Sequence, residues 1–201
     1  MLRVGLTGGL ASGKSFVGEQ LAALGCFLIQ ADRLGHEVLL PDGEAYAAAV
    51  AEFGAGILNP DRTIDRRKLA ALVFTNPERL ALLNGMVHPP VRERTLKLLE
   101  SFGAREPNGI AVVEAAILIE TGTYKSYQRL IVAVCTEEEQ LERAMRRDGI
   151  SRDEALSRLR RQLPLSEKVK YADYVIDTSG SKQRTIEQTR AVYESLRRIP
   201  Q

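Results

Sequence analysis

Short apolar runs alternate with longer amphipathic stretches along this chain. The apolar runs that have the length of a strand lie at residues 2–6, 26–29, 110–114, 130–135 and 174–177. The run at 130–135 is unbroken and rich in β-branched residues, as expected of a strand covered on both faces. Strands that are interspersed with helices predict an α/β fold in which the strands form a parallel sheet.

Helical periodicity follows the first run. Val17, Leu21 and Leu24 share one face of a helix that the pattern predicts over 15–24, and Gly25 closes it. The first strand therefore leads through a glycine-rich turn into an amphipathic helix.

Two capping boxes mark helix starts in the second half of the chain. Thr136 is followed three positions later by Glu139, and Ser151 by Glu154, which is the spacing of this motif. We therefore predict two helices here, and a last helix over about 182–198.

Residues 34–102 show helix after helix and no convincing strand. The predicted helices cover 34–40, 44–53 and 65–74, one begins at Pro77 behind an Asn76 N-cap, and one runs from Pro89 or Pro90 to Phe102. This block is longer than a connection between neighbouring strands needs, so we expect an insertion that binds substrate.

The composition fits a single domain without a nucleic-acid or membrane partner. The 201 residues are 44% hydrophobic and 27% charged, and the net charge of +2 gives no general affinity for nucleic acid. Cys26 and Cys135 lie in apolar runs, so we expect buried thiols and no disulfide. The chain enters its first strand at once and has no apolar run near the roughly 20 residues of a membrane span. We expect a cytoplasmic monomer.

The turn after the first strand carries the spacing of a phosphate-binding P-loop, in which four residues separate Gly8 from Gly13-Lys14-Ser15. Its glycines let successive backbone N–H groups converge on phosphate oxygens at a helix start. Lys14 would reach the β- and γ-phosphates, and the Ser15 hydroxyl would ligate Mg²⁺. The predicted nucleotide-binding residues are Gly8, Gly9, Leu10, Ala11, Ser12, Gly13, Lys14, Ser15 and Phe16. The alternative is a glycine-rich turn with an incidental lysine.

Asp32 follows the second strand, in the segment Gln30-Ala31-Asp32-Arg33. In a parallel sheet its carboxylate would lie at the carboxyl edge, where ligands bind, beside the P-loop. There it would orient an attacking hydroxyl, accept its proton or support the metal shell. The alternative is a helix N-cap, a position that aspartate also favours.

Other candidate site residues lie at helix junctions and in one loop. Arg66 and Arg67 begin a helix, and His88 with Arg92 stands at a helix junction, where these side chains would hold anionic or polar substrate groups. The apolar segment 115–120 would contact an apolar part of the substrate. Each candidate has a structural alternative, namely solvated arginines, a packed or capping histidine, and core filling.

Basic residues concentrate between 143 and 170. We expect this segment to form a helical lid that closes over the nucleotide and neutralises the transferred phosphate. Nucleic-acid binding is the competing interpretation, but acidic residues are interleaved and no aromatic stacking set is present. The basic residues are Arg143, Arg146, Arg147, Arg152, Arg158, Arg160, Arg161, Lys168 and Lys170.

The segment Asp177-Thr178-Ser179-Gly180 has the D-x-x-G spacing of a GTPase switch. It comes late in the chain, however, and no N-K-x-D motif is present, so a nucleotide-dependent switch lacks its base-reading element. We therefore predict a turn near the adenine end of a nucleotide.

Taken together, these residues resemble the dephospho-coenzyme A kinase family over nearly the whole chain. The P-loop of residues 6–15 and Asp32 match that family's motifs, and an ordered set of further matches follows. This set is Arg66, Leu69, Phe74, Leu83-Asn84, His88-Pro89, Arg92, Arg143, Arg147-Asp148-Gly149, Ala155, Arg158, Gln162, Ala172-Asp173 and Val175-Ile176-Asp177. The chain departs from the family pattern where Gln30 replaces an acid, Phe16 a threonine, Ala116-Ile117 a Pro-Leu pair and Thr178 an asparagine.

The resemblance implies a P-loop NTPase-type three-layer fold and transfer of the γ-phosphoryl of ATP to the ribose 3′-hydroxyl of dephospho-coenzyme A. It implies catalytic roles for Asp32, as the base, and for Lys14, Arg143 and Arg147. The implied substrate contacts are Asp32, Arg66, His88, Leu118 and Glu120, and the implied cofactors are ATP and Mg²⁺, the metal on Ser15. A kinase of another nucleotide or small hydroxylated metabolite is the alternative.

The organisation implied is one kinase domain in three parts. Its core would cover about 1–32, 104–142 and 171–201, its substrate-binding insertion about 33–103 and its lid about 143–170.

Overall fold

The computed structural model describes residues 1–73 and 76–200. They form two compact units, Met1–Gln30 with Leu99–Gln201, and Ala31–Leu98, which we call the sheet unit and the helical unit. Phe74, expected to end an amphipathic helix and to match the family pattern, lies outside the described residues.

The described part of the sheet unit is built on five parallel strands. These are β1 (Leu2–Gly8), β2 (Phe27–Gln30), β3 (Ile110–Glu114), β4 (Arg129–Val134) and β5 (Tyr174–Asp177). Their order is β2-β3-β1-β4-β5. The central strand is therefore β1, and the turn that leaves its carboxyl end is flanked by β3 and β4. Each predicted strand is confirmed, with ends that agree to within two residues.

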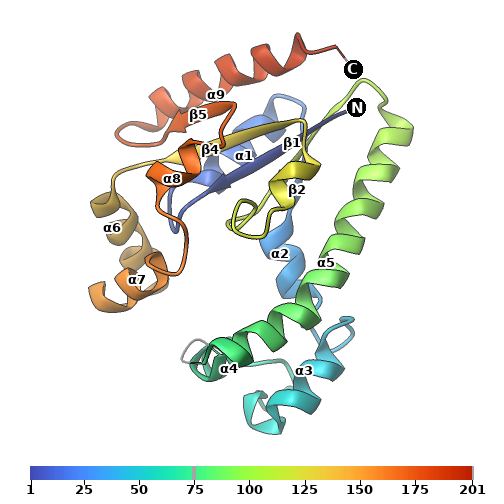
Figure 1. Cartoon of the computed structure of the whole chain (residues 1–201), viewed down its shortest axis with the longest axis vertical. Coiled ribbons are helices and arrows are strands. Elements are labelled where there is room, and N and C mark those ends of the chain that lie inside the picture. Colours follow the sequence, from blue (N-terminus) through green and yellow to red (C-terminus); the bar gives the residue numbers. More distant parts are fainter. Residues whose placement is uncertain (74–75, 201) are drawn as a thin grey trace. The chain divides into compact units, whose positions relative to one another are not determined.

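One face of the sheet is covered by α1 (Lys14–Ala23) and α9 (Lys182–Arg197), which pack beside each other (Figure 1). Alternate residues of each strand point to this face, and their apolar side chains form the main core with both helices. Its buried members are Leu2, Val4, Leu6, Val17, Leu21, Cys26, Ile110, Val112, Ile131, Ala133, Ile176, Val192 and Leu196. Both predicted helices are thus confirmed.

Both capping boxes are confirmed in the second half of the sheet unit. They open α6 (Glu137–Asp148) and α7 (Arg152–Leu159), with the Thr136 and Ser151 side chains accepting from backbone N–H groups of the first turns. The sequence did not predict α8 (Leu165–Val169), a single short helix that packs on β4, or the 3-10 turn Thr123–Ser126. Such short elements lack the repeated apolar positions by which longer helices are recognised.

The thiols are only partly as expected. Cys26 is buried, and its burial raises the pKa of the thiol to about 12. Cys135 is only half-buried, because β4 ends at Val134 and leaves this residue in the following loop. Both cysteines are free, as predicted.

The helical unit contains α2 (Ala31–Glu37), α3 (Tyr46–Phe53), the 3-10 turn Ala55–Ile57, α4 (Arg66–Val73) and most of α5 (Pro77–Arg105). Ile57, Leu69 and Val73 form its small buried core. In place of strands, the described part of this unit has one isolated antiparallel bridge, between Leu58 and Ile64.

Two helices of this unit differ from the sequence prediction. A single helix, α5, replaces the predicted pair, because the fixed φ of Pro89 and Pro90 suits a helix although each removes an N–H donor. The helix changes direction along its length instead of ending (Figure 1). The other, α2, begins at Ala31 rather than at Leu34. None of the described helices, long α5 included, is apolar enough to cross a membrane.

Neighbouring residues of β5 test the position of the main core. Ile176 is fully buried, whereas Val175 is 44% exposed. We expect Ile176→Ala to lower the free energy of unfolding by roughly 3 kcal/mol, and Val175→Ala by less than about 1 kcal/mol. Urea unfolding of both variants measures the difference, and equal losses would contradict this placement of the core.

Candidate active site

The P-loop joins β1 to α1 through two residues with left-handed backbone. Gly13 has a φ of 81° and directly precedes Lys14, the first residue of α1. A side chain here would also lie 2.8 Å from Thr178 Oγ1, so only glycine fits. Ala11 has a φ of 51°, which an L-residue adopts at a cost of roughly 1 kcal/mol. The loop thus turns sharply onto the α1 N-terminus, an end that favours anions.

A buried carboxylate beside this loop was not singled out from the sequence. Glu114 ends β3, is 3% exposed, and accepts from Ser15 Oγ at 2.5 Å and from Gln30 Nε2 at 3.2 Å. The parallel register places it directly across from Leu6 of β1. A signal was present, since an acidic residue ends an apolar strand at the sheet edge where ligands bind.

The two principal catalytic candidates lie in different units. Lys14 begins α1 in the sheet unit, and Asp32 lies in the first turn of α2 in the helical unit. Because α2 begins at Ala31, Asp32 lies inside the helix and not at the residue before it. The alternative that Asp32 is the helix N-cap is therefore wrong. That Asp32 faces the nucleotide stays a prediction.

Within the helical unit, Asp32 belongs to a charged group that includes a histidine missed by the sequence analysis. His36 lies one turn after Asp32 on α2. Burial and the positive charge of Arg66 lower the pKa of His36, and the negative charge of Asp32 opposes them. Two predicted substrate residues, Asp32 and Arg66, are therefore within electrostatic range of His36. His88 lies in α5 just before Pro89, and partial burial lowers its pKa.

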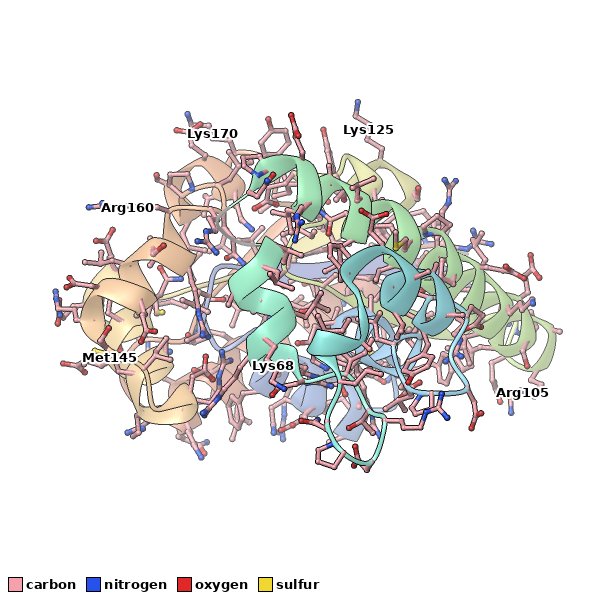
Figure 2. The ribbon with its side chains drawn as sticks, turned by 90° about the horizontal axis from the view of Figure 1, so that it is seen from below. Lys68, Arg105, Lys125, Met145, Arg160 and Lys170 are labelled. Carbon is pink, nitrogen blue, oxygen red and sulfur yellow. The ribbon has the colours of Figure 1, made fainter. Side chains whose placement is uncertain are left out.

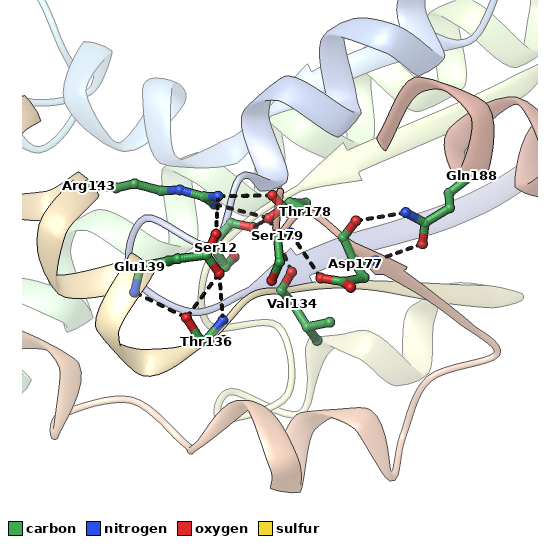
Figure 3. Close-up of polar contacts among 9 residues, drawn as sticks. All are labelled: Ser12, Val134, Thr136, Glu139, Arg143, Asp177, Thr178, Ser179 and Gln188. Carbon is green, nitrogen blue, oxygen red and sulfur yellow. Dashed lines mark hydrogen bonds and ion pairs between the residues drawn. The ribbon is translucent and has the colours of Figure 1, made fainter. Parts of the chain in front are cut away.

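Arg143 is oriented by contacts that end at the P-loop (Figure 3). Its guanidinium donates to Thr178 Oγ1 at 3.1 Å and Thr178 O at 2.9 Å, and to Glu139 Oε1 at 3.1 Å. Thr178 Oγ1 in turn lies 2.8 Å from the carbonyl oxygen of Ser12. The D-x-x-G segment therefore packs directly against the phosphate-binding loop.

Other members of the basic segment have different surroundings. Arg147 and Arg158 both pair with Asp148, at 2.7 Å and 3.0 Å. Arg160 and Lys170 extend away from the ribbon (Figure 2). The structure thus separates Arg143, held beside the P-loop, from these four basic residues, which form surface pairs or extend outward.

Two residues of the loop after β3 are held by contacts within the sheet unit. Leu118 is only 4% exposed, in keeping with the core-filling alternative. Glu120 Oε1 accepts from the buried Lys168 at 2.8 Å and from the backbone N–H of Leu163 at 3.0 Å. The loop is therefore tied to the segment that contains α8.

A family model described as "Dephospho-CoA kinase" matches residues 2–184. The dephospho-CoA kinase of Aquifex aeolicus is 40% identical over 200 residues, which are 100% of this chain and of that protein. That of Carboxydothermus hydrogenoformans is 45% identical and covers 92% of this chain and 89% of that protein. The crystal structure of TT1252 from Thermus thermophilus is similar with a TM-score of 0.81 and 32% identity, covering 97% of each chain.

Glu139 links the stability of this site to pH. Hydrogen bonds from Ser179 and Thr136, with the charge of Arg143, lower its pKa from 4.5 to about 2. Because the folded state favours the carboxylate, this stabilisation is present above pH 4.5 and is lost as the pH falls toward 2. We expect Glu139→Gln to lower the urea concentration at the unfolding midpoint at pH 7. We also expect this midpoint to fall less steeply in the variant as the pH is lowered from 4.5 toward 2.

Glu142→Gln on the exposed surface of the same helix is the matched control. If the unfolding midpoint of the Glu139→Gln protein depends on pH as that of the unaltered protein does, the stabilising role of the Glu139 carboxylate is contradicted.

Proposed function

The chain belongs to the dephospho-CoA kinase family, and on this premise we propose that it transfers the γ-phosphoryl group of ATP to the ribose 3′-hydroxyl of dephospho-CoA. The observation that carries the proposal is the P-loop of residues 8–15, placed at the carboxyl end of the central strand of a parallel sheet. The product is coenzyme A, so the reaction is the last step of its synthesis.

In this reaction the O3′–P bond forms as the bond between the β,γ-bridging oxygen and the γ-phosphorus breaks, and ADP leaves. The transition state is loose, so alignment and charge stabilisation are what the protein supplies. We assign to Lys14 and the amides of the P-loop the binding of the β- and γ-phosphates. Ser12 Oγ is buried in this loop and has no hydrogen-bond partner among the described residues. This unsatisfied hydroxyl supports the binding of a ligand whose oxygens can accept its hydrogen bond.

We assign to Asp32 the alignment of the 3′-hydroxyl and the late acceptance of its proton. Arg66 acts electrostatically on the same histidine, His36, as Asp32 does. We therefore propose that Arg66 holds an anionic part of dephospho-CoA near the proposed base. We retain His88, Leu118 and Glu120 as proposed substrate residues, although Leu118 and Glu120 also have structural partners.

Arg143 and Arg147 are proposed to neutralise the transferred phosphoryl group. Arg143 has the stronger support, because its contact with Thr178 sets it beside the P-loop. We also keep the proposed division into a core (about 1–32, 104–142 and 171–201), an insertion that binds dephospho-CoA (about 33–103) and a lid (about 143–170).

The residues beside the P-loop fit a magnesium ion that arrives with ATP. Mg²⁺ prefers oxygen ligands and is commonly held by one or two carboxylates or hydroxyls together with substrate phosphates and water. Ser15 and Glu114 supply a hydroxyl and a carboxylate 2.5 Å apart. When bound, the ion would be held by Ser15 and Glu114 and would offset the negative charge of the phosphates.

We propose a cytoplasmic location, where ATP is supplied, and action as a monomer. Size-exclusion chromatography with light scattering tests the second point, and a mass of 22.2 kDa is expected.

Release of ADP from ATP is the direct test of the activity. We expect release to require both dephospho-CoA and Mg²⁺. Lys14→Ala and Asp32→Asn should each lower kcat by about 100-fold or more, because each removes a group needed in the transition state, while circular dichroism stays unchanged.

Lys125→Ala and Asp42→Asn make the same chemical changes on exposed side chains and serve as controls. ADP release that dephospho-CoA does not stimulate would contradict the proposed reaction. Normal turnover by the Asp32→Asn protein would remove the proposed base alone.

The proposed metal ligand is tested by Glu114→Gln. This change keeps the shape of the side chain but removes the charge that attracts the cation, so the Mg²⁺ concentration for half-maximal activity should rise by about tenfold. Binding of ATP without Mg²⁺, measured by calorimetry, should stay the same. An unchanged Mg²⁺ requirement would exclude Glu114 from the metal site.

A further inference from the structure

Three alternate carbonyl oxygens of the P-loop accept hydrogen bonds from side chains of three separate segments. Lys168 Nζ of α8 lies 3.3 Å from Gly8 O, and Gln140 Nε2 of α6 lies 2.6 Å from Leu10 O. Thr178 Oγ1, just after β5, lies 2.8 Å from Ser12 O. The proposed mechanism gives none of these three side chains a contact with ATP or dephospho-CoA, although Thr178 also holds Arg143 and Lys168 also pairs with Glu120.

Peptide geometry gives this pattern a consequence. In a trans peptide unit the carbonyl oxygen of one residue and the N–H of the next point in opposite directions. The described backbone contains no cis peptide bond. Fixing the carbonyls of residues 8, 10 and 12 therefore aims the N–H groups of Gly9, Ala11 and Gly13 away from the three donors. N–H groups that converge form an anion-binding nest, which is the arrangement that the P-loop spacing predicts here.

Each donor is itself held firmly. The Lys168 side chain is fully buried, and its ammonium donates to Gly8 O, to Ala116 O at 2.7 Å and to the Glu120 carboxylate. Gln140 is 4% exposed, and its amide lies so close to Gly9 that a side chain at that position would collide with it.

The third donor is the most directly placed. Thr178 is 7% exposed and has a single hydroxyl hydrogen, with Ser12 O at 2.8 Å nearer than Val134 O at 3.1 Å. Arg143 donates to the same hydroxyl, which leaves that hydrogen for a carbonyl oxygen (Figure 3). The loop conformation also includes the unfavourable φ at Ala11, so outside contacts are needed to hold it.

We propose that Lys168, Gln140 and Thr178 are positioning residues that keep the amides of the P-loop preformed for the phosphates of ATP. They act through the loop backbone and not by touching the nucleotide. The inference deepens the proposed function, since it takes ATP as the ligand of this loop. Removing one donor lets a peptide unit of the P-loop rotate. Part of the binding free energy of ATP is then used to return this peptide unit to its binding orientation.

Thr178 gives the sharpest test. Thr178→Val keeps the shape of the side chain but removes the donor, so we expect ATP binding, measured by calorimetry without dephospho-CoA, to weaken by roughly five- to tenfold. Thr178→Ser restores the hydroxyl and should bind ATP within about twofold of the unaltered protein. Gln140→Met leaves the contact between Arg143 and Thr178 in place and should weaken binding in the same way, whereas a loss confined to Thr178→Val would assign the effect to Arg143 and overturn the proposal.

Thr189→Val is the matched control. Thr189 is fully buried and its hydroxyl donates to Thr185 O at 2.7 Å within α9, so the change removes the same kind of hydrogen bond at another place. We expect it to lower the unfolding temperature but to leave ATP affinity unaltered. Unaltered affinity in Thr178→Val and Gln140→Met, or an equal loss in Thr189→Val, would overturn the proposal.

This outcome is separate from that of the proposed reaction. Failure of the reaction would be seen as ADP release that dephospho-CoA does not stimulate in the unaltered protein, whereas the positioning role is measured by ATP binding without an acceptor.

Discussion

A peptide loop that turns its N–H groups toward phosphate must point the carbonyl oxygens of the same peptide units the opposite way, where they also need partners. In this chain the partners of those carbonyls come from α6, α8 and the residue after β5. They are 130 to 166 positions away from the loop along the sequence. The phosphate-binding turn is therefore a property of the assembled sheet unit, although its sequence signature is local.

The sequence predicted what depends on local chemistry. Apolar runs predicted the strands. The capping residues Thr136 and Ser151 predicted the starts of α6 and α7, because the side-chain oxygen of a cap binds an N–H group in the turn that follows it. The P-loop was found for the same reason. The sequence could not reveal that Glu114 meets Ser15, or that Lys168 reaches Gly8, because these pairs form only when distant segments fold together.

Two departures from the family pattern gain a physical explanation. Gln30 stands where an acid was expected, and its amide donates to Glu114, so the buried carboxylate has a hydrogen-bond donor where a second negative charge would have repelled it. Thr178, in place of asparagine, still presents a hydrogen-bond donor to the P-loop. For Phe16 and for Ala116-Ile117 the structure offers no comparable account. The relation of Asp32 to Lys14 also stays a prediction, since these residues belong to separate units.

The pair formed by α6 and α7 has a consequence for how the chain folds. Both helices carry complete capping boxes, and Leu141, Ala144 and Ala155 bury one another across the pair, so its contacts are short in sequence. Local helical contacts form faster than pairing between distant parallel strands. A hairpin that forms early shortens the effective loop between β4 and β5 and reduces the entropy lost when these strands meet. The segment proposed to cover the nucleotide would then also speed the closure of the sheet edge.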